Sequence, residues 1–393
     1  MSSKLLHLCL TGKYTDGYSY QENILTYYHK KLGLDVVVIA SLESFDNNGL
    51  PCLVESSGEY VNSDGIRVIR LKYKNGWQKF NQRFRRYAEL YDSLQKEQPD
   101  ILFIHGCQFA DISVVVKYLK QSNKKVTVYI DNHSDFSNSA RNWISKNILH
   151  KVIWRYYAKK IEPFVKKFYG VLPARCDFLE NMYQIPREKI ELLVMGADDE
   201  KIEECDKSDA RINIRKQLGI TKDDFVMITG GKIDRYKNID LLMESVCQMN
   251  LPNLKLIVFG SIIPELKSVI NDLSNHESIC YIGWLESGDV YKYFGASDLA
   301  VFPGRHSVLW EQAVGCGLPA IFMRWDGMTH VDIGGNCIFL APVNIQEIKK
   351  SIEYVLNNKK GYQKMKDVAT SKGKNIFSYK KIAQKAIEME IDD

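Results

Sequence analysis

Residues 298–322 read DLAVFPGRHSVLWEQAVGCGLPAIF, and this stretch decides how we interpret the rest of the chain. Leu299 to Phe302 is a short apolar run suited to a strand buried on both faces, and Pro303-Gly304 ends it. Val308 to Val314 has helical spacing, and the glycines and proline of residues 315–319 stop the helix. The stretch therefore predicts a strand, a loop, a helix, a tight turn and a second strand.

The loop between this strand and helix brings Arg305, His306 and Ser307 to one place. In a parallel sheet such a loop lies at the carboxyl end of a strand, facing a helix N-terminus. The free N–H groups there, beginning at Val308, favour an anion. We therefore expect a phosphate-binding site at this loop.

The same run resembles the donor-binding loop and glutamate helix of family 4 glycosyltransferases, which have the GT-B fold. The family pattern is a proline, a loop and two glutamates with seven residues between them. Glu311 matches the second glutamate, and the resemblance implies that it accepts hydrogen bonds from ribose hydroxyls. The first glutamate has no match, because Pro303 stands eight positions before Glu311. Arg305 and His306 would replace that missing acidic contact, which leaves the identity of the donor sugar open.

A second loop of the same kind follows the apolar run of residues 225–229. Gly230 and Gly231 let backbone N–H groups approach an oxyanion, and Lys232 and Lys237 can place two ammonium groups on one diphosphate. Gly-Gly-Lys alone is weak evidence, since it is not a Walker sequence. In the resembled family, basic residues at these two positions contact the leaving nucleoside diphosphate.

The loop after residues 279–282 carries Gly283 and Trp284. In the resembled family the corresponding loop meets the nucleotide base through its backbone. Trp284 could stack on that base, or it could be an ordinary core residue.

The first half of the chain begins with another strand, loop, helix and strand unit. Leu5 to Leu10 and Leu34 to Ala40 are typical of buried strands, and Tyr20 to Leu32 has helical spacing. The connecting loop, residues 11–17, lacks the spaced glycines of a dinucleotide fingerprint. In the resembled family this loop borders the acceptor site, which implies that Gly12 contacts the acceptor.

Two further apolar runs, residues 100–105 and 125–130, each end in a histidine-bearing loop. The second loop, which contains Asp131 and His133, resembles the family loop whose histidine approaches the reacting face of the donor sugar. That resemblance implies acceptor-side roles for Asp131 and His133 and a catalytic role for His133 as well. The alternative is that His133 caps the next helix or supports Asp135, and we interpret His105 as a residue that packs its own loop.

Two stretches combine basic and aromatic residues. Residues 67–86 contain no acidic residue and include Trp77 and Phe80, while residues 141–167 carry a single acidic residue, Glu162. Basic side chains attract anionic headgroups, and Trp and Tyr suit the boundary between water and lipid. We expect peripheral association with an anionic membrane, the alternative being a solvated helix face. No motif accompanies the charge to indicate nucleic-acid binding.

The bulk properties indicate a globular protein of two domains. The 393 residues suffice for two cores, and an apolar content of 45% with 26% charged residues is ordinary. The formal net charge of +5 arises entirely within residues 1–200. Nine cysteines occur without a C-x-x-C pair, so we predict no metal site. The start shows no long apolar segment, and we expect a cytoplasmic protein that associates peripherally with the inner face of the cell membrane.

Strands alternate with helices along the whole chain, including an expected strand at residues 171–174. This pattern predicts an α/β protein, and the resemblance implies the GT-B fold, with two Rossmann-like parallel-sheet domains facing a central cleft. We assign acceptor binding to residues 1–200 and nucleotide-sugar binding to residues 201–375. Residues 376–393 would form a helix that packs back on the first domain.

The resemblance implies a retaining glycosyltransferase that moves a hexosyl group from a nucleotide-sugar to a carbohydrate or lipid-linked glycan, in cell-surface polysaccharide synthesis. The donor would be UDP- or GDP-linked, and catalysis would use Lys232, Lys237, Glu311 and His133 without a cofactor or metal. Two alternatives remain open. A sugar-nucleotide epimerase could share the architecture, and the absent first glutamate could mark a non-catalytic partner subunit of the same fold.

Overall fold

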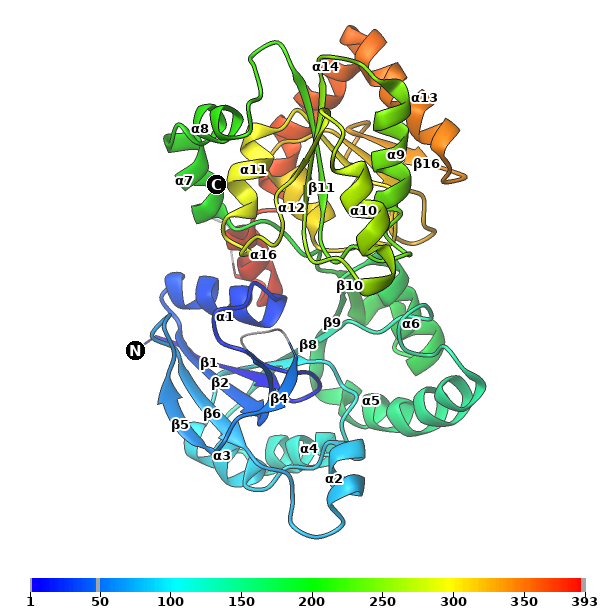
Figure 1. Ribbon diagram of the computed structural model, residues 1–393. Helices are drawn as coiled ribbons and strands as arrows, with labels where there is room; N and C mark the ends of the chain where they lie inside the picture. The colour runs from blue at the N-terminus through cyan, green and yellow to red at the C-terminus, as the bar shows by residue number, and fades with distance from the viewer. Residues whose placement is uncertain (1, 47–49, 390–393) are drawn as a thin grey trace. The chain divides into compact units, whose positions relative to one another are not determined.

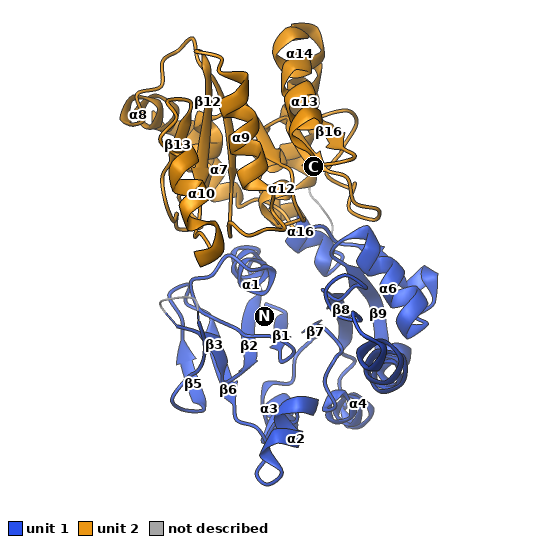
Figure 2. Ribbon diagram, turned by 45° about the vertical axis from the view of Figure 1, so that its right-hand side comes forward, with its two compact units in different colours: residues 1–194, 382–393 blue, residues 195–381 orange. Residues whose placement is uncertain are grey.

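The structure is a computed structural model in which residues 2–46 and 50–389 are described. The chain forms two compact units, shown in separate colours in Figure 2. Unit 1 consists of residues 1–194 and 382–393, and unit 2 consists of residues 195–381. The sequence places the division near residue 200, and in the structure it falls between Val194 and Met195. The segment that returns to unit 1 begins at Ile382, later than the expected residue 376.

Unit 1 is built on an eight-stranded sheet with the order β10-β9-β8-β7-β1-β2-β6-β5; all of these strands except β7 are labelled in Figure 1. Every neighbouring pair is parallel except β5 and β6. The strands are β1 (Lys4–Cys9), β2 (Asp35–Ser41), β5 (Gly58–Val61), β6 (Arg67–Leu71), β7 (Ile101–His105), β8 (Thr127–Asn132), β9 (Val165–Gly170) and β10 (Ile190–Leu192). The helices are α1 (Gln21–Lys31), α2 (Gln78–Phe84), α3 (Leu90–Glu97), α4 (Ile112–Gln121), the π-helix η1 (Ser145–Trp154), α5 (Arg155–Ile161) and α6 (Pro173–Tyr183).

The two faces of this sheet carry different side chains because successive residues of a strand point to opposite sides. Leu6 and Leu8 of β1 join a large apolar core with residues of α3, α4, α5 and α6. On the other face β1 presents His7, which is fully buried beneath α1. Buried polar groups need hydrogen-bond partners. The packing on this second face must therefore supply such partners, which the apolar core on the first face does not need.

Three features of unit 1 differ from the sequence expectations. The strand expected at residues 171–174 is wrong: the strand is β9, and α6 already begins at Pro173. The apolar pattern of the sequence did not reveal β9, because Lys166 and Lys167 make the first half of this strand polar. A small antiparallel pair, β3 (Glu43–Phe45) and β4 (Pro51–Leu53), was not expected. Neither was the ten-residue π-helix η1.

Residues 382–389 pack on the polar face of the unit 1 sheet through side-chain hydrogen bonds and ion pairs. Tyr129 donates to the carbonyl of Ile387 at 3.1 Å, and Tyr169 donates to that of Lys385 at 3.2 Å. His29 lies 2.8 Å from the carbonyl oxygen of Ala383. The C-terminal segment thereby satisfies polar groups that the sheet and α1 bury.

Unit 2 is a six-stranded parallel sheet with the order β13-β12-β11-β14-β15-β16. The strands are β11 (Phe225–Gly230), β12 (Leu254–Phe259), β13 (Ile279–Tyr281), β14 (Leu299–Phe302), β15 (Ala320–Met323) and β16 (Cys337–Leu340). The helices are α7 (Asp199–Lys207), α8 (Ala210–Gln217), α9 (Ile239–Met249), α10 (Lys267–Leu273), α11 (Val290–Ala296), α12 (Leu309–Gly315), α13 (Ile345–Asn357), α14 (Lys359–Val368), the π-helix η5 (Ala369–Gly373) and α15 (Lys374–Ile376). Helix α16 (Tyr379–Ala386) starts in the residues of unit 2 and ends in those of unit 1.

The described residues include no helix with both the length and the hydropathy needed to cross a bilayer.

Candidate active site

In unit 2, the loops that follow β11 and β14 are neighbours because these two strands pair in the sheet. The N–H of Arg305 donates to the carbonyl of Tyr236 at 2.9 Å, and the side chain of Asn238 donates to the carbonyl of Pro303 at 2.9 Å. A Cβ at Gly304 would overlap the backbone of Lys237, so only glycine allows this approach. The two loops that the sequence singles out therefore form one continuous surface.

Lys237 is the most strongly held side chain of this surface. Its ammonium donates to the carbonyls of Arg305 at 2.6 Å and His306 at 3.3 Å. Burial lowers its pKa to about 8, with Arg305 lowering it further and Asp234 opposing the shift. Lys237 is therefore a partly buried cation whose hydrogen-bond partners are neutral carbonyl oxygens. Such a group is suited to binding an anionic ligand.

The other basic groups here differ in exposure. Lys232 is exposed and makes no hydrogen bond or ion pair with another described residue. The guanidinium of Arg305 stacks on the ring of Tyr236 at 3.9 Å and lies 6.0 Å from that of Trp325. Together with Lys237, these side chains contribute three positive charges to the loop surface, to which the exposed Arg235 of the same loop adds another.

Glu311 lies in the first turn of α12 and is fully buried. Its Oε1 accepts from His306 Nε2 at 2.7 Å and from His330 Nε2 at 2.8 Å. Burial alone would raise the pKa of Glu311, but the two histidines more than offset it and lower the pKa to about 2. His306, expected beside the donor sugar, thus contacts Glu311, and His330 is a partner that the sequence did not reveal.

Several buried polar atoms around Glu311 have no partner within the described chain. They are Glu311 Oε2, Ser307 Oγ, Trp310 Nε1, Trp325 Nε1 and His330 Nδ1. Unsatisfied buried polar atoms are costly and rare in folded proteins. Their concentration beside the Arg305 loop is typical of a binding site. Contact between Glu311 and a ribose, which the resemblance implies, stays a prediction.

The remaining donor-side candidates lie at the ends of neighbouring strands. Gly260 follows β12 and donates its N–H to the carbonyl of Gly283 at 2.6 Å. A Cβ on Gly260 would overlap the carbonyl of Gly231, and one on Gly230 would overlap the ring of Phe259. Trp284, which could have been a core residue, is 70% exposed. Gly230 and Gly260 thus let these strand ends approach one another, and the exposed indole of Trp284 is available for stacking.

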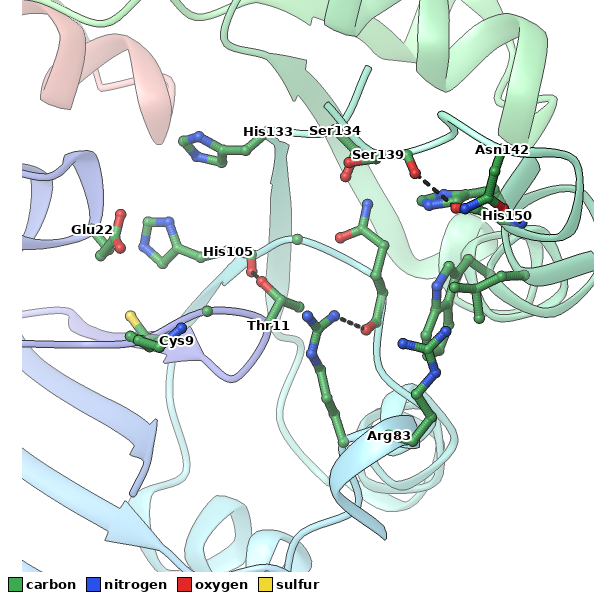
Figure 3. A pocket seen from close by; sticks show the side chains of 18 residues that line it. Cys9, Thr11, Glu22, Arg83, His105, His133, Ser134, Ser139, Asn142 and His150 are labelled. Atoms are coloured by element: carbon green, nitrogen blue, oxygen red, sulfur yellow. Dashed lines mark hydrogen bonds between the residues drawn. The ribbon is translucent and has the colours of Figure 1, made fainter. Parts of the chain in front are cut away.

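Unit 1 contains a cavity of about 580 Å³, shown in Figure 3. Its lining brings together Gly12 and His133, which the sequence assigned to the acceptor side. It also includes side chains that the sequence did not assign: Thr11, Lys13, Glu22, Arg83, Arg85, Gln108, Ser139, Asn142 and His150. These hydroxyl, amide and charged groups suit a polar ligand. They escaped notice because they come from five separate segments.

Asp131 lies beneath this cavity and is fully buried. Its Oδ2 accepts from His105 Nδ1 at 2.8 Å and from His133 Nε2 at 3.3 Å. Burial would raise the pKa of Asp131, but the two histidines hold it well below its ordinary value. His105 therefore does more than pack its loop, and His133 is oriented by Asp131 and does not cap a helix with its ring.

Two groups in the described residues place two histidines and a carboxylate within 4.8 Å: His105, Asp131 and His133, and His306, Glu311 and His330. In both, the ring nitrogens converge on one carboxylate oxygen at 2.7–3.3 Å. These are hydrogen-bond distances between a ring nitrogen and a carboxylate oxygen. We treat both groups as hydrogen-bonded clusters.

The comparison that decides the assignment covers most of unit 2. Residues 210–372 match the family described as Glycosyl transferases group 1. This part of the chain is a group 1 glycosyl transferase domain. The match includes Lys232, Lys237 and the segment from Arg305 to Glu311, so the family assignment and the loop surface coincide.

Relatives of this glycosyl transferase domain are distant. A mannosylfructose-phosphate synthase of Agrobacterium fabrum is 23% identical over 234 residues, which are 55% of the chain and 51% of that protein. An uncharacterised glycosyltransferase of Methanocaldococcus jannaschii is 19% identical over 187 residues, 45% of the chain and 47% of that protein. The chain thus matches about half the length of these curated relatives.

Solved structures match over the whole chain. A glycosyltransferase of Rickettsia africae superimposes with a TM-score of 0.70 at 13% identity, covering 99% of this chain and 97% of that one. At these identities the likeness establishes the fold, which is GT-B, with a Rossmann-like parallel sheet in each unit.

Proposed function

We propose that this chain is a retaining, metal-independent glycosyltransferase that moves a hexosyl group from a nucleotide-sugar to a hydroxyl of a carbohydrate or lipid-linked glycan. The observation that carries the proposal is the surface formed by the two unit 2 loops. Within a group 1 glycosyl transferase domain it combines Lys232, Lys237 and Arg305 beside buried, unpaired polar atoms.

Each group has a defined task in the proposed reaction. A diphosphate leaving group gains negative charge as the sugar–oxygen bond breaks, and preorganised cations stabilise that charge. Lys237, held by neutral carbonyls, and the exposed Lys232 supply the charge without a metal. His133, oriented by Asp131, would hydrogen-bond the transferring sugar, and Gly12 would border the acceptor. The donor is UDP- or GDP-linked.

The cavity of unit 1 supports a glycan acceptor. Side-chain hydroxyls, amides and charged groups from several loops line its walls, and polar groups of these kinds recognise sugar hydroxyls. We assign the acceptor to this cavity and the nucleotide to the loops of unit 2.

The proposed cellular setting is the cytoplasmic face of a membrane, in cell-surface polysaccharide synthesis. Ile144, Ile148, Val152 and Tyr156 recur every four residues along η1 and α5 and are 44–64% exposed. Trp77, 85% exposed, is linked to this helix by ring contacts through Phe80, Phe84 and Trp154. An apolar stripe flanked by lysines and arginines fits an anionic lipid surface.

Vesicle flotation tests the membrane proposal. Vesicles containing anionic lipid should retain the chain, and replacing the exposed Lys79, Arg141 and Lys151 by glutamine should release it. Replacing three exposed lysines of unit 2, Lys350, Lys360 and Lys364, gives a matched control that should still float. Equal binding to neutral vesicles would remove the proposal.

The transferase proposal is tested by incubating the chain with UDP- and GDP-sugars, with and without glycan acceptors, and measuring nucleoside diphosphate and sugar products. We expect slow hydrolysis of one donor without acceptor and faster release with it, both unchanged by a chelator. An epimerised nucleotide-sugar without acceptor would favour the epimerase. A chain that neither binds nor cleaves any donor would be the non-catalytic partner.

A further inference from the structure

Three histidines on the polar face of the unit 1 sheet form a continuous chain of hydrogen bonds. His29 Nε2 lies 2.8 Å from the carbonyl of Ala383, and His29 Nδ1 lies 3.0 Å from His7 Nε2. His7 Nδ1 lies 3.0 Å from His105 Nε2, and His105 Nδ1 lies 2.8 Å from Asp131 Oδ2. All three rings are buried, and the row ends at Asp131, the carboxylate that also orients His133.

Counting protons shows what this arrangement requires. Four hydrogen bonds join five groups in a row, and each bond needs one proton. The Ala383 carbonyl and an ionised Asp131 supply none, while three neutral imidazoles supply one each. A neutral set of rings would therefore leave one contact of 2.8–3.0 Å between two lone pairs. The row is complete only with a fourth proton.

The carbonyl end of the row and the burial of two rings together give the bond directions. A carbonyl only accepts, so His29 carries a proton on Nε2; because burial and neighbouring histidines disfavour a charged His29 or His7, His29 Nδ1 accepts from His7 Nε2. His7 Nδ1 then accepts from His105 Nε2. The fourth proton lies between His105 Nδ1 and Asp131 Oδ2. Asp131 Oδ2 also accepts a hydrogen bond from His133, and an ionised carboxylate oxygen accepts two such bonds better than a protonated one does. The fourth proton therefore lies on His105.

The surrounding charges agree with this placement. Asp131 raises the pKa of His105 against the effect of burial, and Glu22 on α1 adds to that increase. Burial lowers the pKa of His29 to about 4 and that of His7 well below its ordinary value, with neighbouring histidines adding to both shifts. The nearby Cys9 thiol stays neutral, because burial raises its pKa. His105 thus carries one positive charge, and the buried carboxylate of Asp131 is its counter-charge.

We propose that His7, His29 and His105 are positioning residues that together hold one excess proton, and that this proton compensates the buried charge of Asp131 so that His133 keeps its N–H on Nε2. The ring nitrogen left for a hydroxyl in the cavity is then His133 Nδ1. The role of His133 in transfer rests on the proposed function, whereas the proton count does not.

Two substitutions at His7 separate the proton count from simple packing. His7→Gln keeps one donor and one acceptor, so the row still needs a proton on both nitrogens of His105. His7→Leu removes both, so His105 can be neutral. His276, which accepts from Ser278 N–H in a turn of unit 2, provides the control His276→Gln.

The experiment is ¹⁵N NMR of the full chain labelled at histidine, at pH 7.5, with resonances assigned from the variants. We expect His7 and His29 to be neutral with the proton on Nε2, and His105 to be protonated on both nitrogens. The doubly protonated signal should persist in His7→Gln and His276→Gln and vanish in His7→Leu. Three neutral rings in the wild type would overturn the proposal, and so would loss of these protons on adding one equivalent of Zn²⁺, which would mark a metal site.

Activity gives a second readout that a merely structural role would not move. If the chain transfers sugar, His7→Leu should lower kcat about tenfold and shift the alkaline limb of the pH profile of kcat. In the His7→Gln protein, kcat and its pH profile should both stay as in the wild type. An unchanged profile in a folded His7→Leu protein would contradict the link to His133. Failure to find any transferase activity would overturn the proposed function alone, since the NMR result is independent of it.

Discussion

The pH dependence of nucleotide binding should report the state of Lys237. Burial lowers the pKa of this ammonium from 10.5 to about 8 in the unliganded chain, and the carbonyls of Arg305 and His306 are its hydrogen-bond partners. A bound diphosphate would favour the charged form and raise this pKa again. Above pH 8, binding must therefore take up a proton.

The magnitude follows from linkage. With a pKa of about 8 in the free chain and a much higher one in the complex, the Kd for nucleoside diphosphate rises roughly tenfold per pH unit above 8. Between pH 7.5 and 9.5 the increase is about 25-fold. Stability changes in the opposite direction. Between pH 8 and 10.5 the unfolded chain binds more protons at this lysine than the folded chain, so the free energy of unfolding rises with pH.

Isothermal titration calorimetry with UDP or GDP across this pH range provides the measurement. Lys237→Met should bind weakly and lose the pH dependence, whereas Lys232→Met should also bind more weakly but keep it, because Lys232 is exposed. A wild-type Kd that stays constant from pH 7.5 to 9.5, or a Lys237→Met protein with the wild-type profile, would refute the reasoning.

Further predictions concern stability and catalysis. Glu311→Gln should lower the free energy of unfolding, measured in urea at pH 7, by about 3 kcal/mol, since the pKa of about 2 means that the fold favours the carboxylate. Wild-type stability of this variant would show that the hydrogen bonds from His306 and His330 do not require a charged carboxylate. Gly260→Ala should destabilise the chain by several kcal/mol, roughly the exceptional end of single substitutions, because a Cβ overlaps the Gly231 carbonyl at a φ of +124°; a small loss would mean that the turn relaxes. His133→Ala should lower kcat at least tenfold with nucleotide affinity unchanged, and wild-type turnover would remove it from the site.

Much of the fold could be predicted because buried parallel strands leave a local signal. The run Leu299 to Phe302 coincides with β14, and the helix expected from Tyr20 to Leu32 is α1, Gln21–Lys31. Strand β9 was missed because its lysines break the apolar run. The edge pair β5 and β6 is antiparallel, which a pattern of alternating strands and helices does not indicate.

The site was less predictable, since its geometry depends on residues far apart in sequence. Glycines and lysines beside a strand are visible as local patterns. The histidine chain depends instead on the register of β1 against β7, which pairs His7 with Phe103 and sets it beside His105. Likewise, nothing near Glu311 in the sequence points to His330, because it lies 19 residues away after the next strand.

The central claim is that the loops after β11 and β14 bind the diphosphate of a nucleotide-sugar. A crystal structure of the chain with bound UDP or GDP tests it most directly. The account predicts the pyrophosphate beside Gly231 and the Arg305 loop, within hydrogen-bond distance of the ammonium groups of Lys232 and Lys237. A nucleotide bound elsewhere, with both ammonium groups facing bulk water, would contradict it.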